Sequence, residues 1–183
     1  MSEIRLDVSF PLDDDGFFRR QCPLCRWEFK IQLPEEDLTT LAQKGLQNYL
    51  VDEGLVEAPE DLEPDETQFM CPYCGQESDH DSWWTEEQAR YIQVFAHNIA
   101  ARIVNEQLVR PLKRQAKGRP TDLISIRIEA TEMKYVEPWI SPEESDMTPF
   151  ELPCCNRRIK VLDEWLDVVH CYFCGFSHRP RPS

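Results

Sequence analysis

The residues best suited to chemistry in this 183-residue chain are its eight cysteines, which lie in four close pairs. Three pairs have C-x2-C spacing and one consists of neighbours: Cys22 and Cys25, Cys71 and Cys74, Cys154 and Cys155, and Cys171 and Cys174. A C-x2-C turn places two sulfur atoms on one side of a tight loop, and two facing turns supply the four ligands of a tetrahedral Zn²⁺ site. The cysteines therefore predict two zinc ions, each held by four sulfur atoms.

An internal repeat indicates which pairs belong together. Residues 25–31 match residues 155–161, and residues 71–75 match residues 171–175. The first site is therefore predicted to use Cys22, Cys25, Cys71 and Cys74, and the second Cys154, Cys155, Cys171 and Cys174. In this alignment Leu152 stands where Cys22 does, so we expect Cys154 to supply the missing ligand. The alternative for the second site is three cysteines with His170 or His178.

The metal and the chemistry of the cysteines have alternatives. Four tetrahedral sulfur ligands accept iron as well as zinc, as in rubredoxin-type sites. Cys71-Pro-Tyr-Cys74 also has the spacing of a redox dithiol, but such a dithiol is expected between a strand and the start of a helix. Gly75 and a polar stretch follow it here. Zinc is therefore the expected metal, and the glycine favours a backbone that curls round it with positive φ.

These motifs resemble the zinc-ribbon superfamily, in particular small bacterial proteins with a Cys-Pro-x-Cys knuckle followed by Phe-Lys and a Cys-Pro-Tyr-Cys-Gly knuckle. The resemblance is carried by residues 22–31 and 71–75, and more loosely by residues 154–161 and 171–175. It implies metal binding between short antiparallel strands. Zinc ribbons serve nucleic-acid binding, protein docking and plain stabilisation alike, so the resemblance implies no single function.

Short strands and turns are expected around the cysteines. Alternating apolar residues predict strands over residues 3–10, 29–33 and 124–128, and another through Ile159 and Val161. Residues 13–16 predict a solvated turn and residues 138–149 an acidic loop. Pro34 and the acidic residues after it predict the start of a helix, within an insertion at residues 34–66 that separates the first two knuckles.

The longest predicted element is a helix that starts after Thr85. Thr85 and Gln88 have the spacing of a capping box, and apolar residues then recur with a helical period. Trp83 and Trp84 are expected to pack against its first turns. We expect the helix to end near Arg110, before Pro111, because proline disfavours helical backbone in the residue before it. Five basic residues crowd this end: Arg110, Lys113, Arg114, Lys117 and Arg119.

The predicted fold class is α+β, with two zinc ribbons of short antiparallel strands joined by the long amphipathic helix. The expected domains are a first ribbon at residues 1–84 with the helical insertion at 34–66, the helix with its basic end at 85–120, and a second ribbon at 121–183. The first 87 residues carry 6 basic and 22 acidic side chains, within a total net charge of −14. A surface this acidic disfavours sequence-independent binding to nucleic acid by the first half.

The expected function is that of a non-enzymatic zinc-binding adaptor that docks onto a protein partner. None of the four histidines has a nucleophile or a carboxylate at a known catalytic spacing. The alternative is a nucleic-acid-binding accessory or regulatory protein that uses the second ribbon and the basic segment 110–119. The N-terminus lacks the features of a signal peptide, and no apolar run is long enough to span a membrane. We therefore expect a cytoplasmic protein.

Overall fold

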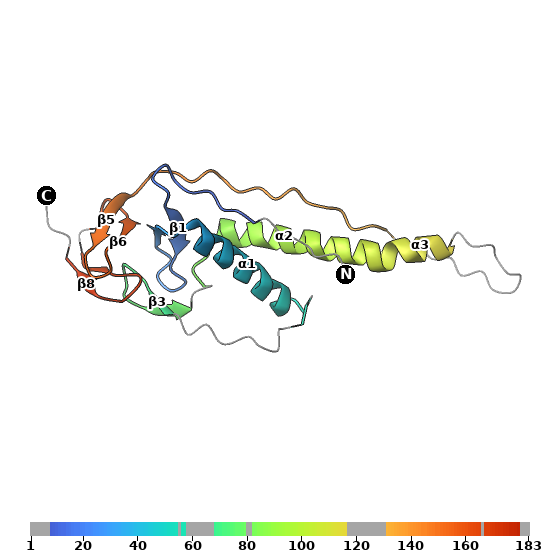
Figure 1. Ribbon diagram of the computed structural model, residues 1–183, viewed down its shortest axis with the longest axis horizontal. Helices are drawn as coiled ribbons and strands as arrows, with labels where there is room; N and C mark the ends of the chain where they lie inside the picture. The colour runs from blue at the N-terminus through green and yellow to red at the C-terminus, as the bar shows by residue number, and fades with distance from the viewer. Residues whose placement is uncertain are drawn as a thin grey trace, which may run out of the picture.

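The structure, a computed structural model, describes residues 8–54, 56–57, 68–79, 82–116, 131–165 and 167–179. The fold mixes α-helices with antiparallel β-strands, as expected. The strands gather at one end of the molecule, and the helices form an arm that extends away from them (Figure 1). The strands expected at residues 3–7 and 124–128 lie outside the described residues, and residues 8–10 have no regular secondary structure.

The strands that flank both sets of cysteines lie in one four-stranded sheet. Its order is β1 (Phe18–Gln21), β2 (Glu28–Ile31), β6 (Arg157–Val161) and β5 (Thr148–Leu152), with every neighbour antiparallel. Two smaller hairpins carry the other cysteine turns: β3 (Gln68–Met70) with β4 (Glu77–Asp79), and β7 (Val169–His170) with β8 (Ser177–His178).

This arrangement differs from the expected two ribbons joined by the long helix, because strands from both halves lie in one sheet. Strands β2 and β6, which occupy matching positions in the repeat, pair directly through Lys30 with Lys160 and Ile31 with Ile159. A single hydrophobic core then spans both halves; its buried members include Phe29, Tyr73, Trp83, Leu152, Ile159, Val169 and Tyr172. The short strands of either half bury little apolar surface alone, so pairing edge to edge gives them a shared core.

The insertion forms the helix α1 (Glu35–Asp52), which packs on α2 (Glu86–Val104). The two helices share a second apolar cluster built from Ala42, Leu46, Leu50, Ile92, Ala96 and Ile99. Phe95 and Ile103 are partly buried against the same cluster. The protein's own insertion helix therefore covers this part of the apolar stripe of α2.

The start of α2 agrees with the sequence prediction. Thr85 and Gln88 form the capping box, with the Thr85 side chain accepting from the Gln88 backbone and the Gln88 side chain accepting from the Thr85 backbone. Trp83 is fully buried in the core, and Trp84 stacks beside Phe10. Both tryptophans therefore fix the helix to the sheet end of the molecule.

The helical path does not end at Arg110, so that prediction is wrong. It continues through a π-helical turn, η1 (Asn105–Val109), into α3 (Arg110–Ala116). Proline has no N–H to donate, and its ring clashes with a carbonyl four residues earlier in a regular helix. The wider π-helical turn, in which the Arg110 N–H reaches the Asn105 carbonyl, ends two residues before Pro111 and allows the helical path to continue through the proline.

An extended strap, residues 131–147, returns along the arm to the sheet (Figure 1). The Asn98 side-chain amide donates to the carbonyl of Val136 and accepts from its N–H, and Asn105 does the same with Met133. Seven helical residues rise about 10.5 Å and three extended residues span about 10 Å, so the two asparagines match the strap in length. The backbone N–H and carbonyl groups of the strap therefore bond to two asparagine side chains of the helical path, in place of the backbone of a neighbouring strand.

Candidate metal centres

The structure brings the eight cysteines together in the two predicted sets. The sulfur atoms of Cys22, Cys25, Cys71 and Cys74 all lie within 4.8 Å of one another, and so do those of Cys154, Cys155, Cys171 and Cys174. Strands β1 and β2 present the first turn and β3 and β4 the facing turn. Hairpins β5–β6 and β7–β8 present the second set in the same way.

The spacing of the sulfur atoms fits a tetrahedral metal ion. Tetrahedral sulfur ligands at 2.3 Å from a metal lie about 3.8 Å from each other. The Sγ–Sγ distances are 3.9 Å for Cys22 and Cys74, 3.7 Å for Cys25 and Cys71, and 3.8 Å for Cys155 and Cys171. All eight cysteines are free of disulfide bonds. Each set can therefore hold one metal ion.

Three of the four turns share one backbone pattern. The first cysteine of the turn donates its N–H to a carbonyl five residues later: Cys22 to Trp27 at 3.0 Å, Cys71 to Gln76 at 2.9 Å and Cys171 to Phe176 at 2.8 Å. The residue after the second cysteine has positive φ in each turn, at Arg26, Gly75 and Gly175. This conformation lets the backbone curl round the cluster.

The fourth turn follows the same path with a leucine in the first position. Leu152 pairs with Arg157, five residues later, and Asn156 has the positive φ found after each second cysteine. Leu152 is fully buried in the core, whereas Cys154 is exposed at the surface. Cys154 therefore joins the second cluster from a position that carries no cysteine in the other three turns.

The electrostatics of each cluster favour a cation. In the first, burial raises the pKa of Cys71 and Cys25, the latter to about 11, while backbone N–H groups outweigh burial and lower the pKa of Cys22. In the second, the Phe176 N–H lowers the pKa of Cys174 to about 7, and burial raises that of Cys154. Four close sulfurs cannot all be ionised by themselves, but a bound divalent cation deprotonates them together.

The two histidines weighed as ligands lie in different places. The imidazole Nε2 of His178 lies 3.1 Å from the sulfur of Cys154, whereas His170 bonds through Nδ1 to the Ser177 hydroxyl at 3.0 Å. His178 is next to the second cluster, but the set of mutually close ligand atoms contains four cysteines. The ring of the other sequence-predicted alternative, His170, lies beside Gly75 in a turn of the first cluster.

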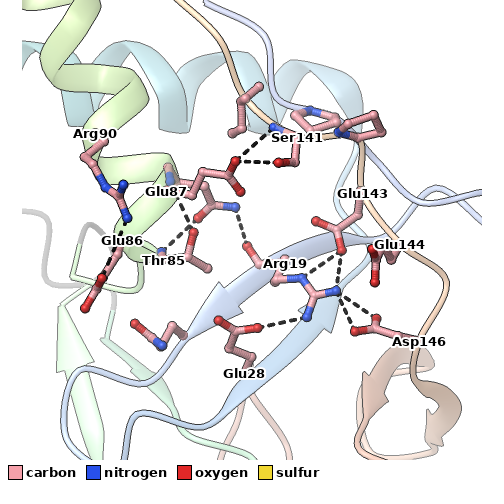
Figure 2. A pocket seen from close by; sticks show the side chains of 15 residues that line it. Arg19, Glu28, Thr85, Glu86, Glu87, Arg90, Ser141, Glu143, Glu144 and Asp146 are labelled. Atoms are coloured by element: carbon pink, nitrogen blue, oxygen red, sulfur yellow. Dashed lines mark hydrogen bonds and ion pairs between the residues drawn. The ribbon is translucent and has the colours of Figure 1, made fainter.

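A polar pocket lies between the start of α2, β1, β2 and the strap (Figure 2). Arg19 dominates it, with its guanidinium held by Glu28 at 2.9 Å, Glu143 at 2.7 Å and Asp146 at 2.7 Å. Burial raises the pKa of Asp146, but the hydrogen bonds from Arg19 and Lys30 lower it to about 2. The charges at the centre of the pocket are thus engaged with one another and tie the strap to the sheet.

Sequence reasoning missed a buried group of charges beside this pocket. Lys30 and Lys160 face each other on β2 and β6, both almost fully buried, and Asp13 lies between them with Oδ2 at 3.3 Å and 2.8 Å from their amines. The predicted solvated turn at residues 13–16 is therefore wrong for Asp13, which is buried. The repeat carried a signal, because Lys30 and Lys160 occupy matching positions in it.

The basic residues expected at the end of the long helix are only partly described. Arg110 and Arg114 are exposed, Lys113 pairs with Glu132 at 3.1 Å, and Lys117 and Arg119 lie outside the described residues. Helix α3 is at the far end of the arm from the sheet that contains β6 (Figure 1). The described basic residues Arg110, Lys113 and Arg114 and the second cysteine cluster therefore do not form one continuous surface.

Comparisons of the chain with models of protein families, with curated proteins and with solved structures found no match. No helix among the described residues is long and apolar enough to cross a membrane. The chemistry supported by these observations is the binding of metal ions by two clusters of four cysteines.

Proposed function

We propose that the protein is a non-enzymatic cytoplasmic adaptor in which two zinc ions hold a rigid sheet and an attached helical arm docks onto a protein partner. The observation that carries the zinc assignment is the sulfur spacing of 3.7 to 3.9 Å in the two clusters, which suits tetrahedral coordination. Zinc has no redox chemistry, and a site closed by four thiolates leaves no position for a substrate. The ions therefore serve the fold.

The first test is the metal content of the purified protein. Protein expressed without added metal should contain two zinc ions per chain, because each cluster supplies a complete ligand set. Elemental analysis by mass spectrometry measures zinc and iron in the same sample. Fewer than one zinc per chain, or iron as the main metal, would contradict the proposal.

The arm is the proposed docking surface. Because α1 covers the stripe around Ile99, the exposed large apolar side chains of the described helical path and strap lie elsewhere on the arm. Leu108 and Leu112 lie further along the helical path, and Tyr135, Val136 and Trp139 lie on the strap. Trp139 has 71% of its surface exposed and Leu108 57%. Aromatic and aliphatic side chains of this kind anchor protein interfaces. Exposed Arg110 and Arg114 lie beside Leu108 and Leu112 in the sequence and favour an acidic rim on the partner.

A charge reversal tests this surface. The double variant Arg110→Glu/Arg114→Glu should lower capture of the partner from the native source by at least tenfold, because rim charges of the wrong sign repel the partner. The matched control is Arg90→Glu, another exposed arginine of the helical path, situated near the sheet. Quantitative affinity purification gives the capture ratio. Zinc content and melting temperature should stay unchanged in both variants.

Capture that survives the double reversal would exclude the basic end as the docking surface. The acidic half of the molecule would then be the better candidate. The arm is supported as the docking surface if the wild type and the control capture the partner equally and the double variant does not.

Nucleic-acid binding is the alternative function and uses the same basic residues. Its proposed surface would join Arg110, Lys113 and Arg114 to the second cysteine cluster, but these lie at opposite ends of the molecule (Figure 1). Lys160 is also buried and paired with Asp13 and Asp15. Binding to DNA and RNA measured over a salt series separates the two functions, because phosphate contacts give an affinity that falls steeply with salt.

A further inference from the structure

We infer that His178 is a reserve ligand of the second metal site, able to replace Cys154 so that the site keeps its metal with three cysteines and one histidine. The inference rests on the proposed zinc binding. Zinc accepts three sulfur ligands with one imidazole nitrogen as readily as four sulfur ligands in structural sites. Among the described residues, the second site would then have five donors for four positions, while the first cluster contains four.

The irregular turn is the first observation. Three of the turns begin with a buried cysteine, but the fourth has the buried, apolar Leu152 there. Its ligand is supplied by Cys154, which is exposed and directly precedes another ligand, Cys155. Neighbouring cysteines lack the two-residue spacing that places both sulfurs on one side of a turn. Cys154 is therefore the ligand of this site held least firmly by its backbone.

The histidine itself is the second observation. His178 Nε2 lies 3.1 Å from the Cys154 sulfur, on a strand that borders the cluster. The rings of Phe150 and Phe176 flank the imidazole, with centroids 6.1 Å and 5.1 Å away. A side-chain rotation of His178, with the backbone of β8 in place, would bring the nitrogen toward the position of the Cys154 sulfur.

The internal repeat provides the third observation. His178 pairs with Val169 across β7 and β8, and the matching pair across β3 and β4 is Ser78 with Phe69. The first site has all its cysteines in regular turns and a serine at this position. The second site lacks a regular cysteine and has a histidine there. The additional donor thus occurs in the half of the molecule where the regular ligand is missing.

Zinc stoichiometry of full-length variants tests the inference. Cys154→Ser and His178→Ala should each retain two zinc ions per chain, and the double variant should retain one. Cys22→Ser should retain at most one, because no described histidine is hydrogen-bonded to a cysteine of the first cluster. Ser78→Ala should retain two. With cobalt in place of zinc, Cys154→Ser should shift the visible absorption bands of the second site to shorter wavelength, as expected when nitrogen replaces sulfur.

A measurement on the unaltered protein covers the case in which a variant fails to fold. Zinc-loaded wild-type protein is treated with iodoacetamide, and mass spectrometry maps the alkylated cysteines. Cys154 should react faster than Cys74, which is also exposed in the first site, and the singly modified protein should retain two zinc ions. Loss of one zinc on modification of Cys154, loss of one zinc in Cys154→Ser, or equal protection of Cys154 and Cys74 would overturn the inference. Wild-type protein with fewer than two zinc ions would instead contradict the proposed function.

Discussion

Removal of the proposed zinc ions should unfold the sheet end of the protein and leave much of the helical arm formed. Structural zinc contributes about 10–16 kcal/mol in zinc-finger peptides, which is comparable with the whole stability of a small domain. Cys22, Cys71 and Cys171, from both clusters, belong to the same buried core. The loss of either ion should therefore destabilise both halves of the sheet. Helices α1 and α2 have a separate apolar cluster and should be affected less.

The measurement compares circular dichroism and thermal unfolding of the zinc-loaded protein, the chelated protein and Cys22→Ser. The matched control is Leu24→Ala, in the same turn but 61% exposed, which should change the melting temperature little. Zinc added back to the chelated protein should restore the melting curve. An unchanged melting temperature after verified removal of zinc would contradict the structural role of the ions.

The cysteine turns and the start of α2 could be predicted from the sequence because they depend on residues close together in the chain. The spacing of Cys71, Cys74 and Gly75 fixes a tight turn whatever surrounds it, and Thr85 with Gln88 fixes the start of α2 through contacts three residues apart. The predicted end of the helix at Arg110 is wrong because it depends on Pro111 alone, and the helical path continues past this proline to Ala116. The π-helical turn that accommodates it is stabilised by Asn105, whose strap partner, Met133, is 28 residues away.

The shared sheet could not be predicted because it depends on contacts between the two halves. The paired residues Lys30 and Lys160 of β2 and β6 are 130 positions apart in the sequence. By its own sequence pattern, either strand could be the edge strand of a separate ribbon. Their pairing also places Lys30 opposite Lys160, a like-charge contact that is unfavourable without a counter-charge. Asp13, from a turn with the composition of a solvent-exposed loop, supplies a counter-charge to both lysines. Glu143 and Asp146 add two for Lys30, and Asp15 adds one for Lys160.

The substitution Asp13→Ala should therefore lower the free energy of unfolding by about 3–5 kcal/mol, because the two buried lysines lose the buried carboxylate that they share. The Asp13 carboxylate accepts from the N–H groups of Asp15 and Phe17 as well as from Lys30 and Lys160. Burial raises the pKa of Asp13, but the bond from Lys160 and the other partners lower it by more than burial raises it. Asp13 is therefore ionised. Its removal leaves the exposed Asp15 as the carboxylate partner of Lys160 among the described residues.

Denaturant unfolding of zinc-loaded protein measures this loss, with Asp14→Ala as the matched control, because Asp14 is the exposed neighbour in the same turn. The control should change stability by about 0.5 kcal/mol or less. The double variant Asp13→Ala/Lys160→Met should recover part of the loss, since an apolar side chain of similar length leaves no charge to compensate. If Asp13→Ala were no more destabilising than Asp14→Ala, the pairing of Lys30 and Lys160 would not depend on Asp13, and the buried charges would have to be balanced by Glu143 and Asp146 of the strap.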